Sequence, residues 1–274
     1  MMGKPAVSRI LPVSLLVIAL FGSRTVQSQA DTLRFNAPIT AFSLSPADDI
    51  YLALADGTII KYAANLDSLL AYSPQRTGRV TLLEAWHGFK VFAFYNDFQA
   101  YTIFDRFLSR PVQYLLGETG GYYADMCTLG QDQQLWIYEE TGLRLLKINP
   151  AYREAEIEIP LEFILDPKAH RISYLKEYQN LLFLVDRQQG IYVFDNMGNY
   201  LRQINVPGAG NCQFRQGNLY MIAGGLLHIT ELYGTKHKTV PLPAGRWQGL
   251  LPLQQKILLI GQQMAISMPY PATP

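Results

Sequence analysis

Residues 182–195 read LFLVDRQQGIYVFD, and this stretch decides the fold. Two runs of apolar and aromatic residues flank the polar segment DRQQG, which is the pattern of a β-hairpin. A strand-like run, RISYLKE at 171–177, precedes the hairpin, and another, NYLRQINVP at 199–207, follows it. The segment therefore predicts a module of four consecutive antiparallel strands.

The same hairpin pattern recurs along the chain with weak sequence similarity. Its other copies are IYLALADGTIIKY (50–62), VFAFYNDFQAYTIFD (91–105), LWIYEETGLRLLKIN (135–149), LYMIAGGLLHIT (219–230) and ILLIGQQMAIS (257–267). Equivalent positions in successive third strands lie about 42 to 46 residues apart, which is the size of one blade of a β-propeller. Apolar residues come in runs and alternations, so we find no helical period. The sequence predicts an all-β fold of six modules.

The two ends of the chain support a closed ring. The last module, from Trp247 to about Pro271, contains only three strand-like runs, whereas the spare run DTLRFN (31–36) precedes the first module. An open sheet edge is a liability for association. We therefore expect the N-terminal strand to complete the last blade of a six-bladed β-propeller. A two-domain β-sandwich or an open meander is the alternative, but it explains neither the six hairpins nor the missing strand.

One module carries a family resemblance. FDNMGNYLRQINVPG (194–208) has a strand ending in aromatic-Asp, a turn with Gly, and a fourth strand that leads to a Pro-Gly corner. YLLGETGG (114–121) is similar to the same corner. In these features the chain resembles the NHL-type and related six-bladed β-propellers. The resemblance implies the architecture and no particular subfamily or function, because propellers host enzymes, binding proteins and scaffolds alike.

Residues 1–30 have the composition of a secretory signal. Two basic residues precede the uncharged run ILPVSLLVIALF (10–21), and Ser28 and Ala30 suit a signal-peptidase site. The run is shorter than the roughly 20 residues of a membrane helix. We expect a cleaved leader (1–30), a single propeller domain (31–274), and export to the periplasm, cell envelope or medium, without membrane insertion of the mature chain. An uncleaved anchor is the alternative.

Composition narrows the classes of function. The 274 residues are 49% hydrophobic and 16% charged, with a formal net charge of +1. Removal of the leader, which holds three basic residues and no acid, brings that charge to −2. A nonspecific nucleic-acid binder needs a basic footprint that this chain lacks. We therefore expect a protein partner and no nucleic acid.

Antiparallel topology predicts which loops share a face of the ring. The turns between second and third strands lie on the same face as the connections between blades, around the channel mouth. The candidate binding residues on this rim are Arg79, Tyr122, Tyr123, His170, Asp186, Arg187, Asn211, Arg246 and Trp247. Aromatic residues and arginines of this kind dominate binding hot spots. A solvated loop face without a ligand is the alternative.

The sequence favours a binding protein over an enzyme. There is no GxSxG motif, and the four histidines are scattered by the topology, which argues against a three-histidine zinc site. We expect no catalytic residues and no cofactor. A channel calcium is the alternative, with Asp125 and Asp166 as candidate ligands, although aspartates at such positions more often cap turns. The leading hypothesis is a non-enzymatic exported protein that presents its rim to a macromolecular partner. The alternatives are a metal-dependent hydrolase or lyase and a sugar or small-ligand sensor.

Overall fold

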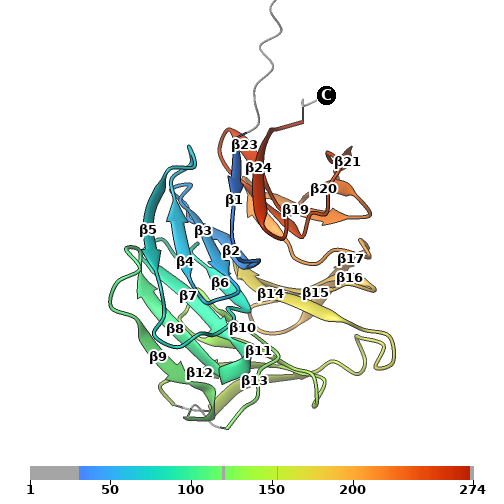
Figure 1. The fold of residues 1–274 in the computed structure, drawn as a ribbon. Coiled ribbons are helices and arrows are strands. Elements are labelled where there is room, and N and C mark those ends of the chain that lie inside the picture. Colours follow the sequence, from blue (N-terminus) through green and yellow to red (C-terminus); the bar gives the residue numbers. More distant parts are fainter. Residues whose placement is uncertain (1–30, 119–120, 153, 272–274) are drawn as a thin grey trace, which may run out of the picture.

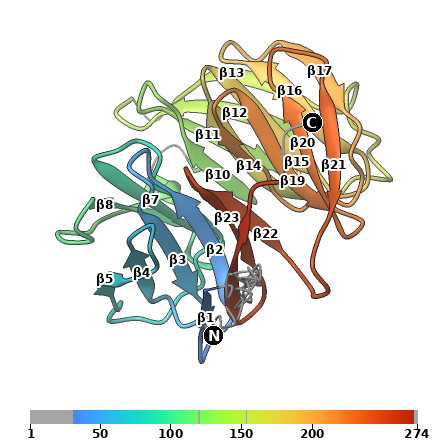
Figure 2. The ribbon, with the colours of Figure 1, turned by 90° about the horizontal axis from the view of Figure 1, so that it is seen from above.

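The computed structural model describes residues 31–118, 121–152 and 154–271, which form six four-stranded antiparallel sheets. The sheets follow one another around a common axis as the blades of a β-propeller (Figures 1 and 2). This confirms the predicted six-bladed all-β fold. Residues 1–30, where the leader is predicted, lie outside the described residues. Among the described residues, no helix has the length and apolar character needed to cross a bilayer.

The strands of the first three blades follow in chain order. Blade 1 consists of β2 (Ile39–Leu44), β3 (Ile50–Leu54), β4 (Ile59–Tyr62) and β5 (Ser68–Tyr72). Blade 2 consists of β6 (Leu82–Glu84), β7 (Lys90–Tyr95), β8 (Ala100–Asp105) and β9 (Val112–Leu115), with the 3₁₀ helices η1 (Asn96–Phe98) and η2 (Leu116–Glu118) in its loops. Blade 3 consists of β10 (Met126–Leu129), β11 (Leu135–Glu139), β12 (Arg144–Asn149) and β13 (Glu154–Pro160).

The remaining blades repeat this order, except that the last one borrows a strand. Blade 4 consists of β14 (Ile172–Tyr178), β15 (Leu181–Asp186), β16 (Gly190–Asp195) and β17 (Tyr200–Ile204). Blade 5 consists of β18 (Gln213–Arg215), β19 (Asn218–Ala223), β20 (Leu226–Glu231) and β21 (His237–Pro241). Blade 6 consists of β22 (Gly249–Pro252), β23 (Lys256–Ile260), β24 (Met264–Pro269) and, as its outermost strand, β1 (Thr32–Arg34).

Pairing of β1 with β24 closes the ring. Leu33 is opposite Ala265, and the backbone N–H of Phe35 continues the pairing by donating to the carbonyl oxygen of Gln263 over 2.9 Å. In Figure 1 the blue β1 lies beside the red β24. The predicted closure of the ring by the N-terminal strand is therefore confirmed.

The hydrophobic core is divided among the six boundaries between blades. At each boundary, apolar side chains from the facing strands of two neighbouring sheets form one cluster. Leu52 and Leu258, for example, are both fully buried in the cluster that joins blades 1 and 6. Because the same strands serve two interfaces, their apolar residues occur in continuous runs, as the sequence shows.

The hairpin that decides the fold turns at Gly190. Its φ of +109° is unfavourable for other residues, and a Cβ there would lie 2.3 Å from the carbonyl oxygen of Ile204. Such turns, together with the connections between blades, form one side of the ring, which we call the mouth face. The turns after first and third strands form the opposite face.

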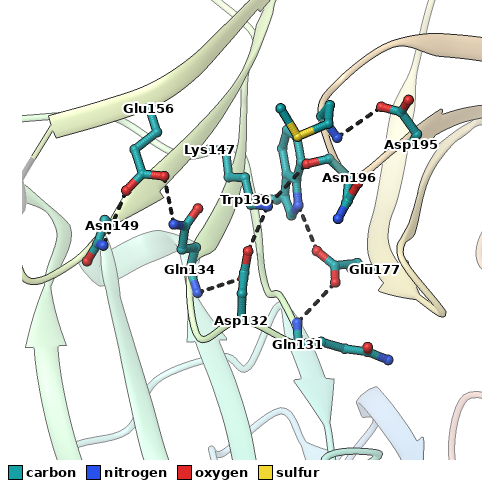
Figure 3. Close-up of polar contacts among 11 residues, drawn as sticks. Gln131, Asp132, Gln134, Trp136, Lys147, Asn149, Glu156, Glu177, Asp195 and Asn196 are labelled. Atoms are coloured by element: carbon teal, nitrogen blue, oxygen red, sulfur yellow. Dashed lines mark hydrogen bonds and ion pairs between the residues drawn. The ribbon is translucent and has the colours of Figure 1, made fainter.

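A buried lysine ties blade 3 to blade 4 near the opposite face (Figure 3). The ammonium of Lys147 lies 2.7 Å from a carboxylate oxygen of Asp132 and donates to the carbonyl oxygen of Asn196 over 3.1 Å. It also lies over the ring of Trp136, 5.3 Å from the centroid. The indole N–H of Trp136 in turn donates to Glu177 of blade 4 over 2.8 Å. The ammonium of Lys147 and the indole N–H of Trp136 therefore each have a partner, and these partners join the two blades.

Blade 1 repeats the same arrangement toward blade 2. The ammonium of Lys61 lies 2.8 Å from Asp49, 5.4 Å from the ring centroid of Tyr51, and 3.4 Å from the carbonyl oxygen of Arg106. Lys61 and Lys147 occupy equivalent positions of the third strand. The repeat therefore conserves a contact between blades as well as a strand pattern.

Charged groups are also buried near the axis, on the first strands. The carboxylate of Glu84 is fully buried and accepts hydrogen bonds from the hydroxyl of Thr128, at 2.9 Å, and from the backbone N–H of Leu129. Burial raises the pKa of Glu84 to about 7, while the positive charge of Lys176 acts in the opposite direction. Burial lowers the pKa of Lys176, which the charge of Glu84 partly offsets.

We predict that Lys147→Ala lowers the free energy of unfolding by about 2 kcal/mol, because it removes the hydrogen bond of a buried ammonium to Asn196, its pairing with the partly exposed Asp132, and the packing of the lysine stem. Chemical denaturation measures the change. Lys168→Ala, at an exposed loop position, is the matched control. Equal stability of the two variants would show that the lysine contributes nothing to the contact between blades.

We predict that Glu84→Gln flattens the pH dependence of stability. A carboxyl whose pKa is raised from 4.5 to about 7 on folding stabilises the fold below pH 4.5, and this contribution is lost as the pH rises through 7. The unfolding free energy of the variant should therefore gain about 3 kcal/mol relative to the wild type between pH 4 and 8. Denaturation at each pH measures it, with the exposed Glu162→Gln as control. A constant difference between variant and wild type would contradict the prediction.

Candidate binding site at the channel mouth

A cavity of about 200 Å³ opens at the centre of the mouth face. First strands, the connections that precede them and the turn between β15 and β16 supply its lining, from Thr40 of blade 1 to Gln248 at the start of blade 6. Three of the predicted rim residues, Arg79, Arg187 and Asn211, line this cavity together. They come from three different loops, which only the closed ring brings together.

The turn between β15 and β16 positions Arg187. The preceding Asp186 is fully buried, and its Oδ1 accepts hydrogen bonds from the backbone N–H groups of Arg171, at 3.0 Å, and Gln188, at 2.7 Å. The guanidinium of Arg187 lies against the backbone of Gly210, where a Cβ would approach Nη2 to 2.7 Å. A glycine is therefore required at 210 for this placement of the arginine.

Amide side chains hold the rim of the cavity in place from Asn211 toward blade 1. The amide of Asn211 donates to the carbonyl oxygen of Gln248 over 2.8 Å. The amide of Gln248 donates to the carbonyl oxygens of Ile39 and Gly261, over 3.0 and 2.9 Å. These bonds connect blades 5, 6 and 1 across the mouth and fix its shape.

The mouth carries positive charge that no salt bridge neutralises. In the described part of the chain, no salt bridge joins Arg79, Arg171 or Arg187 to a carboxylate, and no Asp or Glu lines the cavity, although the buried Asp186 precedes Arg187 in the same turn. Burial lowers the pKa of Arg187, and the charge of Arg171 lowers it further. Arginines gathered at one mouth without a salt-bridge partner favour an anionic ligand.

Other predicted rim residues lie outside the cavity. Tyr123 and Arg246 are exposed on the mouth face. Tyr122 packs into the core between blades 2 and 3, where its hydroxyl accepts a hydrogen bond from the backbone N–H of Ala155 over 3.1 Å. The indole of Trp247 packs against the core between blades 5 and 6 and donates to the carbonyl oxygen of Pro243 over 2.8 Å. Tyr122 and Trp247 thus have structural partners, and their role in binding stays a prediction.

His170 belongs to a polar cluster between blades 3 and 4. Its Nε2 lies 2.8 Å from a carboxylate oxygen of Glu140, and its Nδ1 lies 2.9 Å from the carbonyl oxygen of Asp166. Burial lowers the pKa of His170, but the carbonyl of Asp166 and the charge of Glu140 outweigh it and raise the pKa above its usual value. The histidine therefore stabilises two loops of the mouth face.

The two candidate calcium ligands cap turns. Asp125 accepts a hydrogen bond from the backbone N–H of Glu140 over 2.7 Å, and Asp166 accepts one from that of Lys168 over 2.9 Å. Burial raises the pKa of Asp125. Over the ranges that the structure describes, no group of three or more His, Cys, Asp and Glu side chains is arranged to hold a metal.

The sequence reasoning missed other residues of the cavity and its surroundings. Ser173, whose hydroxyl donates to the carbonyl oxygen of Gly210 over 2.9 Å, and Tyr174 line the cavity from β14. Gln248 lines it from the start of β22. The only sequence signal that could have identified them is their place in the repeat, because each lies at the start of the innermost strand of a blade.

Comparison with known proteins agrees with the architecture. A protein family described as "6-bladed beta-propeller" matches residues 158–236, which span blade 4 and most of blade 5. No curated protein matches the chain.

Solved structures match over most of the chain. Virginiamycin B lyase from Staphylococcus aureus, in a catalytically inactive form with quinupristin, is 12% identical with a TM-score of 0.58, and the match covers 88% of this chain and 99% of that one. YCF48 bound to D1 peptide is 10% identical with a TM-score of 0.56, over 88% of this chain and 97% of that one.

A third match is part of a larger protein. The extracellular domain ascribed to a one-component system from B. thetaiotaomicron is 14% identical with a TM-score of 0.56, over 86% of this chain and 33% of that one. At such low identities these likenesses show the fold alone. With the six sheets of the structure, they show that the chain is a six-bladed β-propeller.

Proposed function

We propose that the protein is an exported, non-enzymatic binding protein that holds a protein partner on its mouth face. The observation that carries the proposal is that Arg79 and Arg187 line the cavity, that Arg171 lies near Arg187, and that no salt bridge among the described residues pairs any of the three. All three arginines are exposed, so a partner that supplies the opposite charge can pair with them and gains affinity there.

The shape of the face supports a macromolecular partner. The cavity holds only about 200 Å³ and is surrounded by exposed loops that carry Tyr123 and Arg246. A small group of the partner can occupy the cavity while the rest of it contacts the loops. Because a ring of sheets presents these loops in a fixed arrangement, little of the binding energy is spent on ordering them. YCF48 bound to D1 peptide shows that a protein of similar fold can take a peptide.

The proposed export rests on the composition of residues 1–30, with the leader cleaved after Ala30. The structural likeness to an extracellular domain is consistent with it.

We predict that a photo-crosslinking amino acid at Tyr123 or Arg246 captures one defined protein from the cell envelope. The same amino acid at Phe107 or Tyr152, both exposed on the opposite face, should not capture it. Mass spectrometry identifies the product, and the affinity of the purified partner for the wild type is then measured. Equal capture from both faces, or failure of the purified partner to bind, would reject the mouth face as the binding surface.

The competing hypothesis, a metal-dependent hydrolase or lyase, makes a different prediction. A catalytic metal site holds on the order of one ion per chain. We expect elemental analysis of the purified protein to find far less divalent metal than that, below about one tenth of an equivalent per chain. Dialysis against a chelator before the measurement is the control. A stoichiometric, chelator-removable metal would favour the enzyme.

A further inference from the structure

Resting on the proposed function, we propose that the mouth cavity receives one carboxylate of the partner, carried by an acidic side chain or by a chain terminus, between Arg79 and Arg187. The inference concerns the chemistry of the group that binds, and it deepens the proposal that a protein binds this face.

The lining of the cavity contains hydrogen-bond donors that a carboxylate can use. Arg79 and Arg187 both line it, and a guanidinium presents paired N–H groups that match the two oxygens of a carboxylate. Tyr174 lines the inner side, and its fully buried hydroxyl has no hydrogen-bond partner among the described residues. The amides of Asn211 and Gln248 are already engaged with backbone carbonyls. The arginines, with the hydroxyl of Tyr174 beneath them, are therefore groups left to bind a ligand.

The position of Arg187 is fixed before any ligand arrives. Its guanidinium is packed on Gly210, whose carbonyl oxygen accepts the hydroxyl of Ser173. No salt bridge among the described residues draws the guanidinium of Arg187 away from the cavity. An arginine that is already in place loses little side-chain entropy on binding.

The charge beneath the cavity favours a monoanion. Glu84, on the same strand as the lining residues Leu82 and Leu83, lies close enough to Tyr174 for its negative charge to raise the pKa of that hydroxyl. Lys176 offsets this charge in part. Because its pKa is about 7, Glu84 is only partly ionised at pH 7, and the remaining charge repels a more highly charged anion such as phosphate somewhat more than a carboxylate. The volume of about 200 Å³ equals roughly six or seven water molecules at about 30 Å³ each, which suits one carboxylate group and a short stem.

The test uses small probes on the full-length mature protein. N-acetylglycine represents a chain terminus, and the α-amide of N-acetylglutamic acid represents an acidic side chain. N-acetylglycinamide lacks the charge, and inorganic phosphate carries more negative charge at pH 7 than either carboxylate. Saturation-transfer NMR at pH 7 gives the dissociation constant of each. We expect at least one carboxylate probe to bind at least tenfold more tightly than the amide and more tightly than phosphate, and the tighter carboxylate identifies the source of the group.

Three variants connect the binding to the cavity. Arg79→Gln and Arg187→Gln should each raise the dissociation constant of the carboxylate probe at least tenfold. Gly210→Ala keeps every charge but places a methyl group where the guanidinium of Arg187 lies, so it should weaken the probe at least threefold. Arg34→Gln, on the outermost strand of blade 6, is the matched control and should leave binding unchanged. Circular dichroism and melting temperature verify that each variant is folded.

Several results would overturn the inference. These are the absence of binding by both carboxylate probes, equal binding of acid and amide, tighter binding of phosphate, or wild-type affinity in Arg187→Gln. The crosslinking experiment uses Tyr123 and Arg246, which lie outside the cavity, so the two tests are independent. Capture at the mouth face without carboxylate binding would leave the proposed function standing and reject the carboxylate. Carboxylate binding without capture would reject the proposed function and leave the carboxylate site standing.

Discussion

The pairing of β1 with β24 is the interaction on which the rest of the structure depends. It joins Thr32–Arg34 to the last strand of the chain and completes the only sheet that the sequence leaves one strand short. Without it, β24 would expose an unpaired edge, and the core cluster between blades 6 and 1, which includes Leu33 and Phe35 at its margin, would lose its outer cover. The mouth cavity spans blades on both sides of this closure, from Thr40 to Gln248, so its geometry exists only in the closed ring.

The closure explains why the architecture was predictable from sequence. Hairpin patterns such as LFLVDRQQGIYVFD are local signals, and the spare strand at 31–36 is visible as a simple mismatch between the two ends. Antiparallel topology then assigns each loop to a face without any knowledge of side-chain contacts. This reasoning groups Arg79, Arg187 and Asn211 on one face, and in the structure the three residues line one cavity.

The orientation of individual side chains was not predictable in this way. Tyr122 and Trp247 come from the predicted face, yet their rings pack into boundaries between blades. The free energy gained by burying an aromatic ring favours this position over an exposed one on a loop. His170 binds Glu140, which belongs to a different blade and is 30 residues away in the sequence. Glu84 and Lys176 were also missed, although a lone charge inside an apolar run, as in VTLLEAW and RISYLKE, is a usable signal for a buried polar contact.

The distribution of charge separates the groups that maintain the ring from those left available for binding. Lys61 and Lys147 each form an ion pair with an aspartate of their own blade and donate a hydrogen bond to a backbone carbonyl of the neighbouring blade. Their charges are therefore used within the fold. Glu84 and Lys176 compensate each other near the axis. The arginines of the mouth differ, since Arg171 and Arg187 are exposed and no salt bridge pairs either of them with an acid in the described structure. A fold that pairs its buried lysines but leaves these exposed arginines unpaired concentrates positive charge at one place, and a ligand of opposite charge is attracted there.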